Sequence, residues 1–399
     1  MRAFAVLANP FYRRFWLALL ASQLGGWIEA TAFSWLVLEV TGSAESLGIV
    51  VALQFLPALF LSIPAGILAD RFPKRWILFW CFGALMAISA LAGWLILAGS
   101  ISYSLILLFA MLYGTASALS DPARQALAVE LAGLEHYPQA IALNSMGFNL
   151  SRLIGPAIAG IIIASLGLGW AFWIDVALFV PLSIVLLTLP QRGPIPAGPG
   201  NLLQQAIAGI KFVLGNLDIA RTVILVAWIS IFGLNFQTLV PGYARLQLGL
   251  GAQGFGGMMS ALGVGALVAA LVQTQLGPPK FLRIPVAALG LVLAHLGLAL
   301  PLSAWGAGLC FAVAGYAMIA TLISANTFIQ LKVSSELRGR VIAVYSLALI
   351  GTGPLGAYLT GLGLENFGAR TTALALAILT SLGPLLALIH LPNKAQSPK

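Results

Sequence analysis

Three charged side chains lie inside long apolar runs of the sequence: Glu29, Arg152 and Asp175. A single ion at the centre of a membrane-spanning helix costs about 2.5–3.5 kcal/mol on insertion scales, so each of these residues needs a partner, water or a function. Counting about 1.5 Å per residue from the end of each run places all three at a similar depth. One cation and two carboxylates therefore suggest a buried charge cluster that binds and releases protons.

This cluster has more than one interpretation. Arg152 and Asp175 lie on consecutive runs, which favours a structural ion pair; alternatively, Arg152 takes part in substrate binding or in the proton cycle. Glu29 is the candidate proton carrier, because burial favours a neutral carboxyl group whereas an approaching Arg152 favours the charged one. The alternative for Glu29 is a hydrated carboxylate near the outer vestibule.

A second group of charges joins two apolar runs at Asp70, Arg71, Lys74 and Arg75, in a chain of which only 8% of residues are charged. A carboxylate at a tight turn can bind helix N-termini and cationic side chains, so Asp70 could act as a conformational latch between two helix bundles. The alternative is that the three basic residues only set the topology by facing anionic lipid.

The composition requires lipid as a solvent. Of 399 residues, 60% are hydrophobic, and the mean hydropathy is +1.00. The net charge of +9 could suggest nucleic acid as a partner. However, only Arg245 and Arg370 fall outside the predicted basic side, apart from the embedded Arg152. This asymmetry is typical of topology signals, so we expect the basic side to be cytoplasmic and no nucleic acid to bind.

Other chemical groups are sparse. Cys81 and Cys310 lie in separate apolar runs and indicate neither a disulfide nor a metal site. The three histidines are scattered along the chain. We find no removable signal peptide and no sequence motif of a metalloprotease, serine hydrolase or ATPase. We therefore predict no cofactor, no metal and no enzymatic activity.

Twelve apolar runs are long enough to span a membrane. They cover residues 14–38, 46–69, 76–98, 102–128, 138–166, 168–190, 219–247, 253–275, 282–303, 304–331, 338–365 and 369–391. Runs of this length and apolarity favour helices, and an even number places both termini on the cytoplasmic side. We predict an all-α polytopic membrane protein with twelve transmembrane helices.

A polar stretch divides the twelve runs into two sets of six. Residues 191–200 are rich in Pro and Gly, and residues 201–214 could form an amphipathic helix on the inner membrane surface. The predicted organisation is an N-terminal bundle (1–190), a cytoplasmic linker (191–218) and a C-terminal bundle (219–399). The halves echo each other, because Gly155-Pro156 in the fifth run returns as Gly353-Pro354 in the eleventh. Duplicated bundles are typical of secondary transporters.

The loop after the second run resembles a signature of the major facilitator superfamily of transporters. The family pattern, Gly-x-x-x-Asp-Arg-x-Gly-x-Arg/Lys, is matched at Gly66, Asp70, Arg71, Lys74 and Arg75, with Pro73 where glycine is usual. Asp121 and Arg124 look like part of an equivalent cytoplasmic loop. The glycine-proline motif of drug antiporters is matched at Gly147, Gly155, Pro156 and Gly160. Such antiporters carry an arginine in the fourth run, but here that position falls near Ala110.

The resemblance covers essentially the whole chain and is strongest to twelve-span exporters related to enterobactin and macrolide efflux proteins. It implies two pseudo-symmetric six-helix bundles, with the first and fourth helices of each half lining a central cavity. Glu29 would then face the cavity. Loop residues 66–75, together with Asp121 and Arg124, would form the latch.

Aromatic and polar residues in the runs predict an amphipathic substrate cavity. The candidates are Trp27, Gln54, Tyr113, Ser117, Asn149, Trp228, Asn235, Gln237, Asn326 and Gln330. The alternative is that such residues pack helices or anchor them at the membrane interface.

Together these features predict a monomeric secondary active transporter of the plasma (inner) membrane. We expect it to export amphipathic small molecules (siderophore-, macrolide- or drug-like) by alternating access, coupled to protons. Two alternatives remain: transport of lysophospholipid or another lipid-like cargo, and an intramembrane enzyme.

Overall fold

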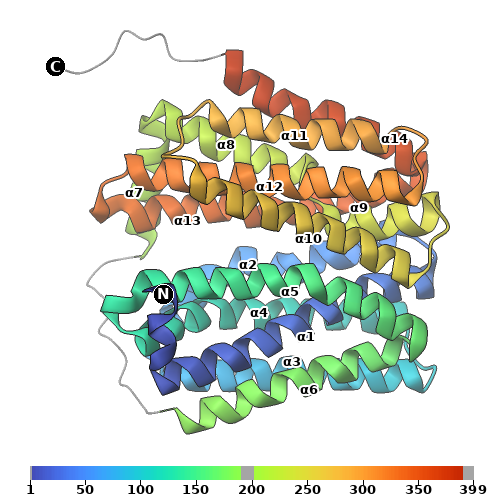
Figure 1. The fold of residues 1–399 in the computed structure, drawn as a ribbon, viewed down its shortest axis with the longest axis horizontal. Coiled ribbons are helices and arrows are strands. Elements are labelled where there is room, and N and C mark those ends of the chain that lie inside the picture. Colours follow the sequence, from blue (N-terminus) through green and yellow to red (C-terminus); the bar gives the residue numbers. More distant parts are fainter. Residues whose placement is uncertain (1, 190–201, 390–399) are drawn as a thin grey trace.

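The computed structural model describes residues 2–189 and 202–389, and every regular element in these ranges is a helix (Figure 1). The elements before residue 190 are η1 (Arg2–Ala8), α1 (Pro10–Thr41), α2 (Ala44–Arg71), α3 (Lys74–Leu97), α4 (Tyr103–Ala132), η2 (Leu134–His136), α5 (Tyr137–Ser165) and α6 (Leu168–Thr188). Those after residue 201 are α7 (Leu202–Gly215), α8 (Leu217–Phe232), α9 (Phe236–Gly242), η3 (Tyr243–Gln247), α10 (Ala252–Gln275), α11 (Arg283–Leu298), α12 (Ala304–Lys332), α13 (Ser335–Gly351) and α14 (Gly353–Ile389).

Local capping residues set several helix ends. Asn9 accepts backbone N–H groups in the first turn of α1, and Pro10 follows it at a position where no amide hydrogen is needed. Gly42 ends α1 with a φ of 66°, which side chains with a Cβ rarely adopt, and Ser43 caps α2. Gly368, with a φ of 74°, bends the long α14 into two helical segments.

Within the described residues, nine helical stretches are long and apolar enough to cross a membrane. One of them, Leu337–Leu388, is 52 residues long and contains the bend at Gly368. The helix α11 is apolar but shorter. The all-helical membrane class is therefore confirmed, while the number of twelve crossings stays a prediction.

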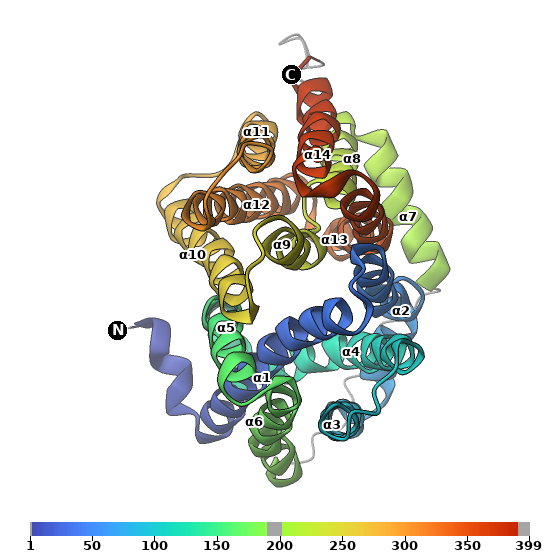
Figure 2. The same ribbon diagram turned by 90° about the vertical axis from the view of Figure 1, so that its right-hand side faces the viewer.

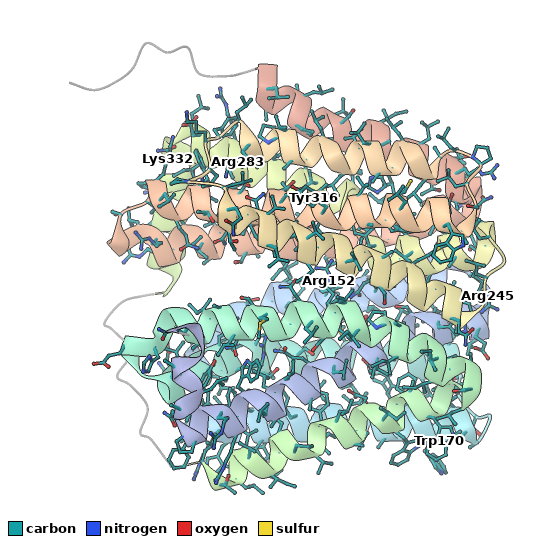
Figure 3. The ribbon with its side chains drawn as sticks, in the orientation of Figure 1. Arg152, Trp170, Arg245, Arg283, Tyr316 and Lys332 are labelled. Carbon is teal, nitrogen blue, oxygen red and sulfur yellow. The ribbon has the colours of Figure 1, made fainter. Side chains whose placement is uncertain are left out.

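The helices form two groups that face each other. The N-terminal group is α1–α6, and the C-terminal group is α8–α14 (Figures 1 and 2). Viewed end-on, α1, α2, α4 and α5 face α9, α10, α13 and α14 across the boundary (Figure 2). We call the end that carries Arg283 and Lys332 the basic end and the end that carries Arg245 the opposite end (Figure 3).

The two groups meet at two related helix pairs near the opposite end. A methyl group added at Gly160 of α5 would lie 2.8 Å from the Ala252 carbonyl oxygen of α10. In the other pair, a methyl group added at Gly48 of α2 would lie 2.7 Å from the Ala357 carbonyl oxygen of α14. Small residues thus let the backbones of α5 and α10, and of α2 and α14, approach closely.

The helix predicted between the groups is present as α7. Gly209 packs against the backbone of Arg340 on α13, whereas Ile207, Ile210 and Leu214 are exposed. This exposed apolar side agrees with a helix that lies along a membrane surface. The Pro- and Gly-rich stretch predicted at residues 191–200 lies outside the described residues.

Candidate functional site

The two buried carboxylates come together inside the N-terminal group. Asp175 on α6 accepts a 2.8 Å hydrogen bond from the Ser89 hydroxyl of α3, while its Oδ1 atom has no hydrogen-bond partner. Glu29 on α1 lies near Tyr113 of α4 and near Asp175, and its Oε2 atom has no hydrogen-bond partner among the described residues. The exposed fractions are 1% for Glu29 and 0% for Asp175. The site is therefore a pair of carboxyl groups in a dry environment.

A glycine makes room for this pair. A Cβ atom at Gly25 of α1 would lie 2.7 Å from Asp175 Oδ1. In the described residues, neither Glu29 nor Asp175 forms an ion pair with Lys or Arg. Because two adjacent carboxylates without a counter-ion repel each other, the arrangement favours at least one bound proton.

Arg152 does not join these carboxylates. Its Nη2 atom lies 3.5 Å from the Met318 sulfur on α12, and its guanidinium carbon lies 5.8 Å from the centre of the Trp27 ring. Figure 3 places Arg152 at the boundary between the two helix groups. The predicted Arg152–Asp175 pair and three-charge cluster are therefore wrong. The physical reason is that α5 directs Arg152 towards the C-terminal group, while Asp175 contacts α3 and α1.

A cavity of about 210 Å³ lies among α1, α3, α4, α5 and α6 of the N-terminal group, reaches Gln237 of α9, and extends along α4 towards the basic end. Four predicted cavity residues line it: Trp27, Tyr113, Ser117 and Gln237. Its inner part is aromatic, because Phe148 packs edge-on against Trp27 with a ring separation of 5.7 Å. The predicted loop residues Asp121 and Arg124 also line it, and form a 2.7 Å ion pair within α4.

Three other predicted cavity residues hold helices together instead. The backbone of Gln54 on α2 packs against Gly114 of α4. The Trp228 indole donates a 2.7 Å hydrogen bond to the Leu379 carbonyl within the C-terminal group. Asn235 donates to the Ile231 carbonyl at 2.6 Å, at the end of α8.

The remaining three make contacts within their own helices. Asn149 donates to the Ser145 carbonyl at 2.8 Å on α5. Asn326 and Gln330 are hydrogen-bonded to each other on α12. These six residues do not line the cavity described above, because their amide, indole or backbone groups are used in helix packing and intrahelical bonds.

The predicted latch residues are separated in the structure. Asp70 is exposed and makes no ion pair within the described residues, and Arg71 is also exposed. Lys74 of α3 forms a 2.5 Å ion pair with Glu130 of α4. Arg75 donates a 2.6 Å hydrogen bond to the Leu189 carbonyl after α6. The Lys74 and Arg75 contacts thus stay within the N-terminal group, and a methyl group at Gly66 would meet no atom within 4 Å.

The glycine-proline motif on α5 contacts two other helices, α1 and α10. Added Cβ atoms at Gly147 and Gly155 would touch α1, at Gln23 and at Trp27 respectively. Gly160 and the Pro156 carbonyl instead contact α10 of the other group. In the matching segment, Pro354 is buried, and an added Cβ at Gly353 would meet no atom within 4 Å.

A cross-group contact at the opposite end was absent from the sequence predictions. Glu365 of α14 accepts a 2.7 Å hydrogen bond from the Ala44 backbone N–H at the start of α2. Nearby, Trp35 of α1 stacks on Phe255 of α10 at 5.8 Å, and the Arg245 guanidinium lies 5.2 Å from the Trp35 ring. A carboxylate at the end of an apolar run was the available signal for Glu365, but its partner is 321 residues away.

Comparison with known proteins identifies the family of the chain. A family model described as transmembrane secretion effector matches residues 1–397. The chain belongs to this family. The transmembrane secretion effector match, together with the efflux relatives below, confirms the predicted resemblance to major facilitator superfamily exporters.

Several curated relatives of the chain are exporters or transporters. The chain is 29% identical over 385 residues to the multidrug efflux pump Tap of Mycobacterium tuberculosis, covering 90% of this chain and 88% of that protein. It is 26% identical over 387 residues to the enterobactin exporter EntS of Salmonella typhimurium, covering 94% and 90%. The staphyloferrin A transporter of Staphylococcus aureus is 30% identical over 265 residues, which span 62% of this chain and 63% of that protein.

Several transporters of known structure share the fold of the chain. A bacterial homologue of the human lysosomal transporter Spinster, inward-facing and unoccupied, matches with a TM-score of 0.77 and 16% identity, covering 96% of this chain and 97% of that one. A D-xylose–proton symporter matches with a TM-score of 0.75 and 16% identity, covering 96% and 98%. The family and these neighbours are transporters, which agrees with the prediction that the chain is not an enzyme. The chain is a multi-pass membrane protein of the major facilitator superfamily.

Proposed function

We propose that this chain is a secondary active transporter that exports amphipathic small molecules (siderophore-, macrolide- or drug-like) across the plasma (inner) membrane by alternating access. The proposal rests on a difference between the two ends of the structure along the membrane axis. The cavity extends towards the basic end, while the two helix groups pack together at the opposite end. The names of the Tap and EntS relatives support the substrate range.

We propose twelve crossings, with both termini in the cytoplasm. The elements α8, α9 and η3 would form the seventh crossing, α13 and the first part of α14 the eleventh, and the part of α14 beyond Gly368 the twelfth. Residues 1–190 and 219–399 would then be two six-helix bundles joined by a linker at 191–218. In this proposal the positive-inside pattern makes the basic end cytoplasmic, and we assign the structure to the inward-open state. One chain holds both bundles and the whole lining of the cavity, which supports a monomer.

Proton coupling is assigned to Glu29 with Asp175. Tyr113 lines the cavity and also reaches the Glu29 carboxyl, so one hydroxyl group links the solute path to the carboxyl pair. A proton held between two buried carboxyl groups removes their repulsion, and its loss restores it. Protonation thereby changes the packing energy of α1 against α6 and biases the equilibrium between access states.

Opening to the outside would require the α5–α10 and α2–α14 contacts to separate. Closure of the basic end would bring Asp70 near the C-terminal bundle, where it could meet helix N-termini or basic side chains. Asp70 is exposed in the inward-open state, as expected for a latch residue whose contacts are broken. The latch therefore stays a proposal for Gly66, Asp70, Arg71, Lys74, Arg75, Asp121 and Arg124.

The test is transport by the purified chain in proteoliposomes with an imposed pH gradient and a labelled efflux substrate. We expect gradient-driven accumulation in the wild type and its loss in Glu29→Gln, while solute exchange without a gradient continues. Glu39→Gln, an exposed position on the same helix, is the matched control and should behave as wild type. Gradient-driven accumulation retained by Glu29→Gln would exclude this coupling role, and a chemically altered solute would indicate an enzyme.

A further inference from the structure

Arg152 occupies the boundary between the two helix groups at the level of the aromatic cavity wall. Its guanidinium lies between Met318 of the C-terminal group and Trp27 of the N-terminal group (Figure 3). Trp27 and its neighbour Phe148 both line the cavity. The guanidinium is therefore next to the proposed solute path and in contact with both halves of the molecule.

The hydrogen-bonding capacity of Arg152 is largely unused. A guanidinium carries five N–H donors, and within the described residues the one side-chain hydrogen bond of Arg152 is to a thioether sulfur, which is a weak acceptor. Ion pairs in the described residues join Lys74 to Glu130, Arg124 to Asp121 and Lys332 to Asp218, so none uses Arg152. A cation in a membrane interior is costly without a partner.

The carboxylates nearest in depth are already engaged elsewhere. Asp175 accepts a hydrogen bond from Ser89, and Glu29 lies near Tyr113 and Asp175, all within the N-terminal group. The missing partner of Arg152 is therefore best supplied by a molecule that enters the cavity. Its apolar or aromatic part would lie against Trp27 and Phe148, as expected for an amphipathic ligand.

We propose that Arg152 binds a negatively charged oxygen group, such as a carboxylate, on the transported solute. This inference rests on the proposed transport function and narrows it to amphipathic anions. Because α5 and α12 belong to different helix groups, an anion at Arg152 would also contact both groups at once. Guanidinium groups bind carboxylates through two parallel hydrogen bonds, which gives both strength and orientation.

The test uses two probes with the same ring system, 1-pyrenebutyrate and 1-pyrenebutylamine. Binding is measured on the full-length chain in nanodiscs of phosphatidylcholine, which carries no net charge. We expect the wild type to bind the butyrate about tenfold or more tightly than the amine. Arg152→Met should lower the butyrate affinity about 10- to 100-fold and leave the amine affinity unchanged, whereas Arg152→Lys should keep part of the preference.

Arg221→Met is the matched control. Arg221 is another half-buried arginine with an unbonded nitrogen, but it lines a separate cavity beside Trp228. Its substitution should leave both affinities unchanged. Glu29→Gln should also keep the anion preference, which separates solute binding by Arg152 from a Glu29–Arg152 ion pair in another state.

Three results would overturn the proposal: equal loss of both probes in Arg152→Met, no loss of the butyrate, or loss of the anion preference in Glu29→Gln. Displacement of the butyrate by phosphatidylglycerol in the nanodisc would assign Arg152 to a lipid headgroup and also overturn it. The proposed transport function is judged separately in proteoliposomes. Gradient-driven transport by the wild type together with an unchanged butyrate affinity in Arg152→Met would overturn this inference alone. Absence of any transport together with an intact binding preference would overturn the transport function alone.

Discussion

The buried carboxyl groups of Glu29 and Asp175 and the guanidinium of Arg152 offset the cost of burial in different ways. Glu29 and Asp175 lie together, with the Ser89 hydroxyl bonded to Asp175 and Tyr113 near Glu29. Arg152, by contrast, faces a sulfur atom and an aromatic ring at the group boundary. Carboxyl groups can become neutral by binding a proton, but a guanidinium cannot. This difference assigns proton binding to the first site and anion binding to the second.

At this residue scale, we predict that Tyr113→Phe slows gradient-driven transport about tenfold or more. The substitution removes the hydroxyl group near Glu29, and a hydrogen bond from a hydroxyl to a carboxylate contributes about 1.5–3 kcal/mol. Transport rates in proteoliposomes measure the effect. The matched control is Tyr103→Phe at the other end of α4, whose hydroxyl contacts the Ser46 carbonyl at 3.4 Å. Equal rates in Tyr113→Phe and wild type would show that this hydroxyl has no part in coupling.

Apolar runs located the helices, whereas the helix ends and the helix rotation were not predicted. The predicted first run, 14–38, lies within the observed Pro10–Thr41, whose ends are set by Asn9 and Gly42. Counting residues along each run predicted one depth for Glu29, Asp175 and Arg152, and Asp175 indeed lies against the α1 turn that carries Gly25 and Glu29. The predicted pairing with Arg152 failed, because depth along an axis does not say which neighbour a side chain faces. That choice depends on how α5 packs against α1 and α10, through glycines whose partners are distant in sequence.

For the same reason, only some of the predicted cavity residues line the cavity. Spacing placed polar and aromatic residues on helix faces, and Trp27, Tyr113, Ser117 and Gln237 line the cavity. Trp228 instead bonds to a carbonyl of α14, a helix some 150 residues away in the chain. An indole or amide serves equally well in packing and in solute binding, so residue type alone could not separate the two.

At the element scale, we predict that Gly256→Val opens the outer contact between α5 and α10. A side chain at Gly256 would overlap the Pro156 carbonyl oxygen. The neighbouring Gly257→Val is the matched control, because a Cβ there meets no atom within 4 Å. The measurement is labelling of Ser34→Cys, which lines a small cavity next to Phe255, by an impermeant thiol reagent from outside, with Cys81 and Cys310 replaced by Ala. We expect labelling several-fold faster in Gly256→Val alone; equal rates in the two variants would contradict this role of α5 and α10.

The second contact, between α2 and α14, predicts a smaller effect. Glu365→Gln removes an anion from the N-terminus of α2, where a negative charge at an exposed position contributes about 0.3–1 kcal/mol. The outward-open population should rise about two- to fivefold, read by the same Ser34→Cys labelling. Glu39→Gln, an exposed carboxylate at the same end, should change nothing. Slower labelling in Glu365→Gln would contradict the proposed stabilisation of the closed outer end.

At the scale of the whole molecule, the α5–α10 and α2–α14 contacts form a pseudo-symmetric closure. Gly160 on the fifth predicted crossing and Gly361 on the eleventh both pack against the backbone of the opposite group, at the first residues of α10 and α2, Ala252 and Ala44. Equivalent contacts on either side of the cavity let the two groups tilt as rigid bodies about their boundary. The central claim is that this tilt exposes one cavity to each side in turn.

Distances between spin labels on the two groups test that claim most directly. One pair reports the basic end (Glu135→Cys with Arg338→Cys) and another the opposite end (Glu39→Cys with Asn366→Cys), all at exposed positions. Without solute, the basic-end pair should be far apart and the opposite-end pair close together. With a transported solute and a pH gradient, a population with the reverse pattern should appear. Distances that stay fixed, or that lengthen at both ends together, would contradict alternating access.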